Sequence, residues 1–412
     1  MYQSFIRYIK NEAHLVGAVA ANIRYGFPSR KLRVIGVTGT DGKTTTSHLI
    51  YHILKSAGKQ VSITSTVFTD IAGVLSETGL HVTTHNHWQL QQNLKKAADA
   101  GSEFFVLETT SHALHQHRVW GVAYEVGVLT NVTPEHLDYH KTFDSYLRTK
   151  VRLLLRSKKA IVNEDAAAFP EVKAVLDKAH KAFTTYSYTN SASPTHWTDD
   201  IRTSLQDVFN KENILAAYAC CKELGLTDEV IRKGIRTFVL PKGRHDKVFD
   251  GSFTVYIDFA HTPHSIAQLL TGLKAPRHRL IHVFGSAGLR DSAKRPEMGR
   301  SSGSFADVVI LTEEDYRTED FMKITQMVST GLFEKGFTYM EPDVLMEHPD
   351  STKVFTIVKN RQKAIEYAID YAQKGDTVVL TGKGHEQSLA RGKKEFPWDE
   401  YKITEKALTK RK

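Results

Sequence analysis

The sequence has few cysteines and no long apolar run, and both absences narrow the classes of protein to consider. Its two cysteines, Cys220 and Cys221, are adjacent in a chain of 412 residues. Adjacent cysteines supply neither a disulfide framework nor a four-thiolate zinc site, so we expect a protein of the reducing cytoplasm. The most apolar stretch near the start, Leu15–Ile23, falls far short of the ~20 residues that a membrane-spanning helix needs. We therefore expect no transmembrane segment, and the lack of a small-residue cleavage pattern argues against a signal peptide.

Positively charged residues are only in mild excess over negatively charged ones. Lysine and arginine number 55 against 46 aspartates and glutamates, which gives a formal net charge of +9. The excess forms no long basic block, so nucleic acid is not an expected partner, whereas an anionic small molecule such as a nucleotide fits. A hydrophobic content of 41% and a charged content of 25% are ordinary for a globular chain and exclude a collagen, a coiled coil or a disordered tail.

Apolar runs of strand length alternate with segments of helical periodicity through the whole chain. This alternation predicts α/β units with mainly parallel sheets. The expected strands are Arg33–Thr38, Gln60–Thr66, Phe104–Leu107, Val126–Thr130, Ala160–Val162, Thr254–Ile257, Leu280–Phe284, Val308–Leu311 and Thr377–Leu380, with turns or an irregular strand pair over Tyr186–Asp200. Expected helices include residues 1–25, Phe143–Leu155 and Thr227–Phe238.

The best domain boundary is Pro241-Lys242-Gly243, which follows an expected helix and precedes a new strand pattern. We expect a helical segment at 1–30, a nucleotide-binding domain at 31–240 and a second α/β domain at 241–412. In the first helix, Val16, Val19 and Ile23 belong to a loose apolar stripe. We expect this stripe to pack on the domain that follows, and docking to a membrane surface or a partner is the alternative.

A glycine-rich segment joins the first expected strand to a helix. Its candidate ATP-binding residues are Gly39, Thr40, Asp41, Gly42, Lys43, Thr44 and Thr45. Glycines let backbone N–H groups turn toward phosphate oxygens, the lysine reaches the terminal phosphates, and the Thr44 hydroxyl suits Mg²⁺. Val37 stands where the strict Walker pattern has glycine, so this is a variant phosphate loop.

The spelling Gly-Thr-x-Gly-Lys-Thr-Thr resembles the ATP loop of the Mur ligase superfamily, the ADP-forming amide ligases. Further matches to that family follow in order: Leu107–Val119, Thr130–His140, Tyr146–Lys150, Phe209–Asn213, Gly243-Arg244, Asp258–Pro263, Gly288–Pro296 and Gly382–Glu386. Within the superfamily they are most similar to the MurE branch, which adds the third amino acid to UDP-MurNAc-L-Ala-D-Glu. The resemblance implies a central P-loop ATPase domain with a mainly parallel sheet, a C-terminal Rossmann-like α/β domain, and ATP and Mg²⁺ as cofactors.

Forming an amide from a carboxylate requires activation, which ATP supplies as an acyl phosphate that an amine then attacks. The resemblance implies that Lys43, Glu108, His136 and Lys150 are catalytic, and that Thr44 joins the last three at the metal. Lys150 would carry a carbamate, which requires a neutral amine and hence a depressed pKa. Read without the family, Glu108 could cap a helix, His136 could be structural, and Lys150 could be an exposed helix lysine.

The resemblance also implies binding residues. Asn210 and Asn213 suit adenine, Arg244 the ATP phosphates, and Asp258 the ribose, with His261 nearby. The carboxylate-bearing muropeptide would be held by Thr83, Thr84, Thr110, Gln116 and Arg118, the last as a planar clamp, although His85 replaces the proline of the family's pattern. A zinc site at His112, His115 and His117 is a weaker alternative, because no carboxylate or cysteine ligand spacing accompanies them.

The sequence departs from the family in two further places. Glu314-Asp315-Tyr316-Arg317 stands where diaminopimelate-adding relatives carry Asp-Asn-Pro-Arg. Arg317 could grip an α-carboxylate, and Arg290, Gly382 and Glu386 would complete the amino-acid site, the glutamate fitting a cationic amine such as diaminopimelate or lysine. Only about thirty residues precede the first strand, where relatives have a UDP-binding domain. We therefore expect altered acceptor recognition: UDP recognition is lost, a partner chain supplies it, or the acceptor is a different carboxylate.

The favoured function is thus an ATP-dependent ligase of peptidoglycan precursor synthesis that takes small-molecule substrates. Closure of the second domain over the first is expected to exclude water. A folylpolyglutamate- or cyanophycin-type ligase with a non-UDP acceptor is one alternative. An ATP-binding subunit without catalysis is another, but it predicts loss of Lys43, Glu108, His136 or Lys150, and all four are present. A phosphate-loop motor or kinase is disfavoured by the matches at Asp258–Pro263 and Gly382–Glu386.

Overall fold

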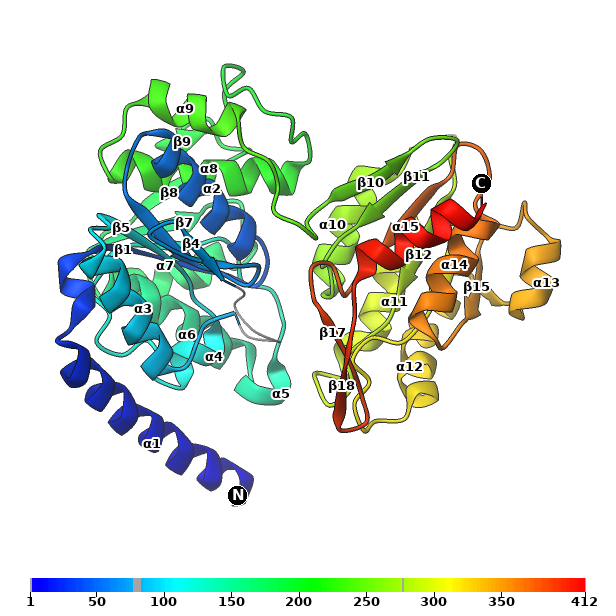
Figure 1. Cartoon of the computed structure of the whole chain (residues 1–412), viewed down its shortest axis with the longest axis horizontal. Helices are drawn as coiled ribbons and strands as arrows, with labels where there is room; N and C mark the ends of the chain where they lie inside the picture. The colour runs from blue at the N-terminus through cyan, green and yellow to red at the C-terminus, as the bar shows by residue number, and fades with distance from the viewer. Residues whose placement is uncertain (1, 77–82, 276–277, 412) are drawn as a thin grey trace. The chain divides into compact units, whose positions relative to one another are not determined.

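The computed structural model describes residues 2–76, 83–275 and 278–411, with side-chain detail from Asn11 onward. The chain forms two units, Met1–Val239 and Leu240–Lys412, each built around its own sheet (Figure 1). Both are α/β structures with mainly parallel strands, as the alternation of strand and helix patterns predicts.

The first unit is built on a sheet with strand order β4-β3-β2-β5-β1-β6-β7-β8-β9 in the described residues. The strands are β1 (Arg33–Thr38), β2 (Val61–Thr64), β3 (Thr69–Ile71), β4 (Val74–Ser76), β5 (Phe104–Glu108), β6 (Tyr124–Leu129), β7 (Lys159–Asn163), β8 (Thr184–Ser187) and β9 (Thr195–His196). All neighbours pair in parallel except β2–β3 and β3–β4, which are antiparallel. The central strands are buried along their length, which explains their continuous apolar sequences.

Helices cover both faces of this sheet (Figure 1). They are α1 (Tyr2–Tyr25), the 3₁₀ turn η1 (Pro28–Lys31), α2 (Lys43–Ser56), α3 (His87–Asp99), α4 (Ser111–His115), α5 (Leu137–His140), α6 (Phe143–Arg156), α7 (Phe169–Lys178), α8 (Val208–Glu223) and α9 (Asp228–Arg236). Leu90 and Leu94 of α3 and Leu153 of α6 pack with Val34 and Phe105 of the sheet. Side-chain caps fix helix starts: Asn86 accepts the N–H of Gln89, and Thr142 that of Ser145.

The expectation that the first helix packs on the domain that follows is confirmed, but through small residues. At Gly17 an added Cβ would lie 2.4 Å from Nε2 of His87 on α3, so the helices approach closely there. Asn22 Nδ2 donates to the carbonyl of Trp120 at 2.9 Å. The predicted stripe is wrong in part, because Val16 and Ile23 are 70% and 64% exposed. Close helix contact favours glycine and alanine over larger apolar side chains here.

The second unit has a sheet with strand order β10-β11-β16-β12-β13-β15-β14 in the described residues. The strands are β10 (Asp246–Asp250), β11 (Thr254–Ile257), β12 (Leu280–Phe284), β13 (Val308–Leu311), β14 (Thr338–Tyr339), β15 (Val354–Ile357) and β16 (Thr377–Leu380), and a separate hairpin is formed by β17 (Ser388–Arg391) and β18 (Lys394–Pro397). Among the described residues of the larger sheet, β10 pairs antiparallel with β11, and the other neighbouring strands pair in parallel. β16 is inserted between β11 and β12, so the strand order reverses beside it.

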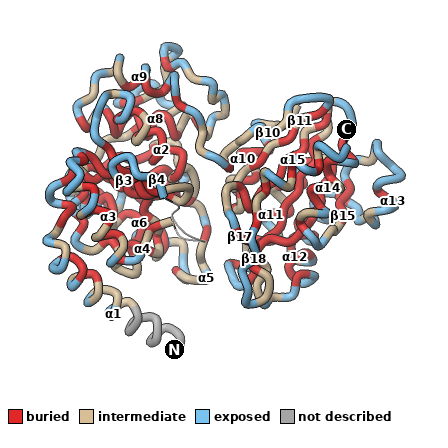
Figure 2. Tube along the Cα trace, in the orientation of Figure 1, coloured by how far each residue is buried: buried red, intermediate tan, exposed pale blue. Residues whose placement is uncertain are grey.

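Six helices in the described part of this unit cover its sheet: α10 (Pro263–Leu273), α11 (Lys294–Phe305), α12 (Phe321–Glu334), α13 (Pro342–Glu347), α14 (Arg361–Tyr371) and α15 (Glu400–Arg411). Side chains of α10, α11 and α12 form one core with the sheet, and those of α13, α14 and α15 form another on the opposite face. Figure 2 shows that buried residues are concentrated on the strands of each unit.

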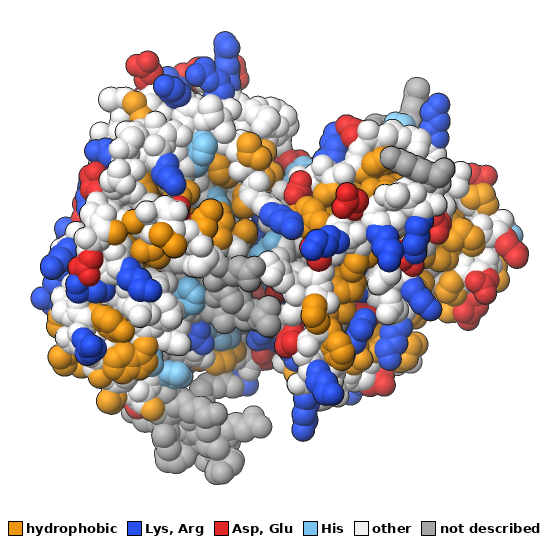
Figure 3. Space-filling model, viewed as in Figure 1, with side chains coloured by type: hydrophobic (Ala, Val, Ile, Leu, Met, Phe, Trp, Pro, Cys, Tyr) orange, Lys and Arg blue, Asp and Glu red, His pale blue; other side chains and the backbone are white. Residues whose placement is uncertain are grey.

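Within residues 2–76, 83–275 and 278–411, none of the helices combines the length and apolar character that a bilayer crossing requires. On the face drawn in Figure 3, lysine and arginine are interspersed with acidic and apolar side chains. This mixed surface agrees with the absence of long basic blocks in the sequence.

Candidate active site

The loop between β1 and α2 has two positions where only glycine fits. A Cβ at Gly39 would lie 1.8 Å from Oγ1 of Thr130, and one at Gly42, whose φ is +80°, would lie 2.3 Å from Oδ1 of Asn213. Lys43 Nζ donates to the carbonyl of Thr40 at 2.8 Å. The lysine expected to meet the terminal phosphates therefore lies against the loop itself.

Asn131 organises the same loop, and sequence reasoning did not single it out. Its Oδ1 accepts the N–H of Thr40 at 3.1 Å and the N–H of Asp41 at 2.9 Å. The available signal was its position two residues after the end of β6, which lies beside β1 in the parallel sheet, so that both strands end at the same edge. Thr45 follows on the first turn of α2 and is buried.

Glu108 and Thr44 meet at the ends of neighbouring strands. Val37 of β1 and Glu108 of β5 are partners in the parallel register. Thr44 Oγ1 donates to Glu108 Oε1 at 3.0 Å, and the N–H of Thr66 donates to Oε2 at 2.9 Å. A buried carboxylate beside a hydroxyl is the oxygen-rich donor set that Mg²⁺ prefers, so these residues fit the expected metal.

Helix α6 carries Lys150 to the phosphate loop. Its Nζ is buried, donates to the carbonyl of Gly39 at 2.5 Å and lies 4.5 Å from the centre of the Tyr146 ring. Burial, with Lys43 as a second cause, holds the pKa of Lys150 well below its usual value. The structure thus places a buried lysine with a lowered pKa beside the loop, which is the kind of environment that the family resemblance implies for Lys150. Tyr146, one turn earlier, lies 3.1 Å from Oγ1 of Thr40.

His136 lies among aromatic rings. It has a φ of +57° directly before α5, and its ring centre is 4.8 Å from that of His112 and 6.3 Å from that of Tyr146. His115 Nδ1 is 3.0 Å from the Tyr139 hydroxyl. In the described part of the chain, no three His, Cys, Asp or Glu side chains gather as a metal-binding group, so the zinc alternative at His112, His115 and His117 gains no support.

The residues expected to hold the carboxylate acceptor form a connected set. Thr84 Oγ1 donates to the carbonyl of Glu108 at 2.9 Å and accepts the N–H of Thr110 at 3.1 Å. Arg118 Nη1 donates to the carbonyl of Thr84 at 3.1 Å, and burial lowers the pKa of this arginine. Thr83 Oγ1 is 3.0 Å from Oγ1 of Thr66, the residue that binds Glu108. The set therefore adjoins the Thr44–Glu108 pair.

One further residue of the expected acceptor site has an unsatisfied group. Oε1 of Gln116 is buried and has no hydrogen-bond partner within the described ranges. Gln116 is the C-cap residue of α4 and directly follows His115. An orphaned amide oxygen at this place is what a binding site for a polar ligand would contain.

The two asparagines of α8 differ in what they contact. Asn213 Oδ1 accepts from the Thr46 hydroxyl of α2 at 3.2 Å, so this residue faces the phosphate-loop helix. Asn210 Nδ2 donates to Asp207 Oδ2 at 3.3 Å, at the N-terminus of its own helix. Both side chains are buried.

In the second unit, Asp258 is fixed by backbone donors. Its carboxylate accepts the N–H groups of His245 and Ala260, each at 2.6 Å. Burial raises the pKa of Asp258, and Arg244 and the two N–H groups oppose the rise. The Arg244 guanidinium lies 4.7 Å from the Phe259 ring centre, and His261 Nδ1 is 2.9 Å from the Phe259 carbonyl.

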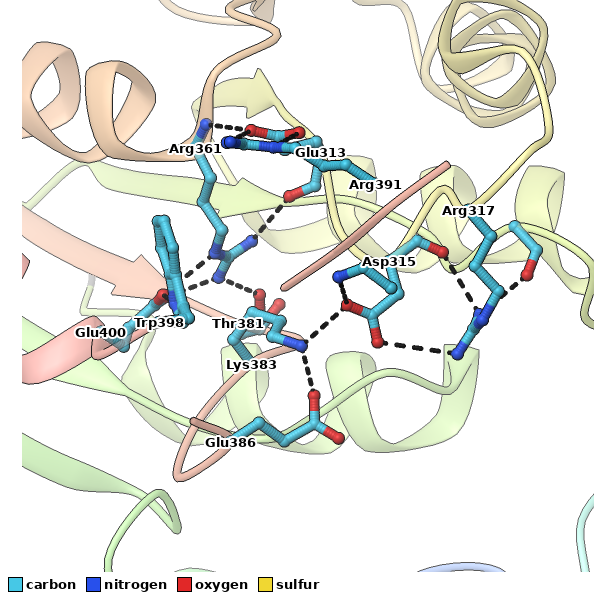
Figure 4. Close-up of polar contacts among 12 residues, drawn as sticks. Glu313, Asp315, Arg317, Arg361, Thr381, Lys383, Glu386, Arg391, Trp398 and Glu400 are labelled. Atoms are coloured by element: carbon cyan, nitrogen blue, oxygen red, sulfur yellow. Dashed lines mark hydrogen bonds and ion pairs between the residues drawn. The ribbon is translucent and has the colours of Figure 1, made fainter. Parts of the chain in front are cut away.

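The expected amino-acid site already contains its own cation (Figure 4). Lys383 Nζ, with no exposed area, donates to Asp315 Oδ1 at 3.0 Å and to Glu386 Oε2 at 2.5 Å. Arg317 Nη1 donates to the carbonyls of Gly288 at 2.9 Å and Asp315 at 3.2 Å. Gly382 precedes this lysine, whereas Arg290 is exposed. The sequence analysis did not predict that Lys383 would form an ion pair with Glu386.

Comparison with protein families gives two matches that together span most of the chain. The Mur ligase middle domain matches residues 37–221, and the Mur ligase glutamate ligase domain matches residues 243–384. The UDP-N-acetylmuramoyl-L-alanyl-D-glutamate–2,6-diaminopimelate ligase of Trichormus variabilis is 36% identical, over 97% of this chain and 82% of its own length. The UDP-N-acetylmuramyl-tripeptide synthetase of Deinococcus radiodurans is 35% identical, over 96% and 81%.

Solved structures give the same picture of the fold. A UDP-N-acetylmuramoyl-L-alanyl-D-glutamate–2,6-diaminopimelate ligase aligns with a TM-score of 0.58 at 28% identity, covering 92% of this chain and 78% of the other. FolC of E. coli, in complex with DHPP and ADP, aligns with a TM-score of 0.66 at 19% identity, covering 88% of each chain. The second likeness concerns the fold alone.

Proposed function

This chain belongs to the Mur ligase family, and we propose that it is an ATP-dependent amide ligase of the MurE type, acting in peptidoglycan precursor synthesis. It joins an amino acid to the carboxylate of an acceptor of the UDP-MurNAc-L-Ala-D-Glu type. The observation that carries the proposal is the convergence of Lys43, Thr44, Glu108 and Lys150 around one phosphate loop. In this assignment, residues 31–240 are the ATP-binding domain, residues 241–412 bind the amino acid, and residues 1–30 are a helical segment.

The first step transfers the γ-phosphoryl group of ATP to the acceptor carboxylate. A carboxylate oxygen forms a bond to phosphorus as the bond to ADP breaks, which gives an acyl phosphate. Lys43 neutralises charge on the transferring group, and Arg118 orients the attacking carboxylate as a planar donor. Thr44 and Glu108 would hold Mg²⁺, which when bound polarises the phosphoryl oxygens.

Lys150 has a separate role in this proposal, as a carbamate. Burial lowers the pKa of its amine, and the neutral amine can add to CO₂: the nitrogen bonds to carbon, one N–H proton leaves to solvent, and the product is an anionic carbamate. A carboxylate-like group at this position would complete the oxygen ligands, with His136 as a candidate nitrogen ligand. The short contact of Nζ with Gly39 keeps the group next to the loop that binds phosphate.

The second step is attack of the amino acid's amine on the acyl phosphate, with release of phosphate. Arg317 and Arg290 are candidates for its carboxylates, and Gly382 and Glu386 line the same site. Asn210, Asn213, Arg244, Asp258 and His261 remain candidates for adenine, phosphates and ribose.

The test is phosphate release with ATP and Mg²⁺, across a panel of amino acids, with and without UDP-MurNAc-L-Ala-D-Glu. We expect release that requires both the acceptor and one amino acid, with the ligated product identified by mass spectrometry. Lys43→Ala should remove release with every substrate. Release that is independent of the muropeptide, or absent with every amino acid, would contradict the proposed reaction.

A further inference from the structure

Glu314 has a buried carboxyl oxygen without a partner. The residue follows β13 at the carboxyl edge of the second sheet and is only 8% exposed. Its Oε2 accepts no hydrogen bond from any residue that the structure describes. The carboxylates on either side are paired, Glu313 with Arg391 and Asp315 with Lys383. A buried polar atom without a hydrogen-bond partner costs free energy. This oxygen therefore indicates that a bound ligand supplies the missing hydrogen bond.

The position of Glu314 ties it to the expected amino-acid site. A Cβ added at Gly382, whose φ is +101°, would lie 2.8 Å from Glu314 Oε2. The free oxygen therefore lies against the backbone of a residue expected to line the amino-acid site. Both residues follow strands of a parallel sheet, close to where β16 reverses the strand order. Ligands of open α/β sheets bind in this crevice, outside the carboxyl ends of the strands.

The charges around Glu314 leave it able to exchange a proton near neutrality. Burial raises the pKa of Glu314 to about 7, and the neighbouring Asp315 adds to the rise. Lys294 of α11, Lys383 after β16 and Arg361 of α14 oppose it. Two of these cations are engaged elsewhere, since Lys383 is paired with Asp315 and Glu386, and Arg361 is paired with Glu400.

We propose that Glu314 is the base that accepts a proton from the ammonium group of the incoming amino acid. This inference rests on the ligase reaction proposed above. An ammonium nitrogen has no lone pair for attack, so one proton must leave first, and Glu314 Oε2 takes it. The amine nitrogen then bonds to the carbonyl carbon of the acyl phosphate, and the carbon–oxygen bond to phosphate breaks. The second proton leaves with the phosphate as hydrogen phosphate.

The decisive variant is Glu314→Gln, which keeps the shape of the side chain and removes the base. The substrates are UDP-MurNAc-L-Ala-D-Glu and whichever of meso-diaminopimelate or L-lysine turns over. We expect kcat/KM of the wild type for the amino acid to rise with pH through about 7, because the carboxylate form lies above that pKa. At pH 7 the variant should be slower by about 10²-fold or more. Its rate should keep rising at higher pH as the amine deprotonates in solution.

Hydroxylamine separates this role from damage to the site. It is largely uncharged at neutral pH, so it can trap the acyl phosphate as a hydroxamate without a base. Glu314→Gln should therefore form hydroxamate at nearly the wild-type rate while ligation of the amino acid is lost. Glu314→Asp, which retains a carboxyl group, should recover part of the ligation, and it serves as the second variant if the glutamine variant does not fold.

Glu212→Gln is the matched control, because burial also raises the pKa of Glu212 to about 7, in the other unit. This variant should keep the rise near pH 7, and loss of that rise in it would contradict the assignment to Glu314. A raised KM with an unchanged pH profile in Glu314→Gln would make the residue a binding group and overturn the inference. Loss of hydroxamate formation would overturn it too. A wild type that makes neither product would instead contradict the ligase function.

Discussion

Lys150 shows how burial shifts the pKa of a single side chain. A lysine on a helix surface would remain an ammonium ion, but this one is enclosed, and a second cation, Lys43, lies near it. Both effects disfavour the charged form. Its Nζ donates to a carbonyl of the phosphate loop, at Gly39. The same features that lower the pKa thus place the amine where an anionic derivative would serve phosphoryl transfer.

Lys150→Ala should reduce ligation by about 10²-fold or more, because the proposed carbamate and its charge are both removed. Short-chain carboxylic acids added in excess should restore part of the rate by filling the vacated space with a carboxylate. The readout is phosphate release with saturating substrates. Arg148→Ala is the control, since Arg148 is on the same helix but its side chain is more than half exposed and forms an exposed ion pair with Asp144. Full activity of Lys150→Ala would refute the carbamate role.

At the scale of elements, a buried ion pair connects two helices to the strand ends beside the proposed amino-acid site. Arg361 of α14 and Glu400 of α15 are both fully buried and form a two-point contact, with Nε–Oε2 at 3.0 Å and Nη2–Oε1 at 2.5 Å (Figure 4). Trp398 Nε1 also donates to Glu400 at 2.7 Å. Arg361 Nη2 donates to the carbonyl of Thr381 at 2.7 Å, directly before Gly382. The C-terminal helix thereby contributes to the position of that loop.

Arg361→Met should lower the free energy of unfolding by about 3–5 kcal/mol, because it leaves the carboxylate of Glu400 buried without its cationic partner. The comparison is Arg300→Met, which breaks exposed pairs with Glu297 and Glu334 and should cost about 0–1 kcal/mol. Urea denaturation of both variants measures the difference. Pairing Arg361→Met with Glu400→Gln should recover part of the loss. Equal, small losses in both single variants would show that the buried pair is not the stabilising feature we infer.

The elements that could be predicted from sequence are those with strong apolar runs. Every strand expected from such a run is present, and Arg33–Thr38 has the expected bounds. The hairpin β17–β18 was missed because β17 has no run of large apolar residues and β18 is exposed, and β10 because an edge strand with one partner needs no apolar alternation. The segment Tyr186–Asp200 contains short strand ends, at Thr184–Ser187 and Thr195–His196. Local pattern therefore finds most central strands and misses most peripheral ones, and it also missed β15, an apolar strand that lies between β13 and β14.

The site shows a similar limit. Motifs locate the phosphate loop, Glu108 and Lys150, because each follows a strand or lies on a clear helix. They do not show which polar side chains satisfy one another. The pairing of Lys383 with Asp315 joins residues 68 positions apart, and the contact of Asn131 with Thr40 joins residues 91 positions apart. Such contacts depend on strand order, which one sequence without relatives does not specify.

At the scale of the whole molecule, the two units have separate hydrophobic cores. The clusters around Val34 and Leu129 contain only residues of the first unit, and those around Val255 and Leu280 only residues of the second. Each core joins a sheet to helices on one of its faces. Domains with separate cores of this size commonly unfold as separate cooperative units.

Differential scanning calorimetry of the full chain should therefore show two transitions rather than one. Arg361→Met should lower the temperature of only one of them, because its contacts lie within the second unit. Leu153→Ala, which opens a cavity in the core around Val34, should lower the other. A single transition that both variants shift equally would mean that the units unfold together.

The phosphate loop draws its shape from two distant stretches of chain, the end of β6 and the start of α8, and this bears on how such enzymes can be recombined. Gly39 fits against Thr130, Gly42 against Asn213, and Asn131 holds the loop's N–H groups. In a chimera that takes only the loop from a relative, the imported backbone would face Thr130, Asn131 and Asn213, which fit the backbone of the original loop. The exchangeable piece is the loop together with the end of β6 and the start of α8, so breakpoints for shuffling belong outside all three.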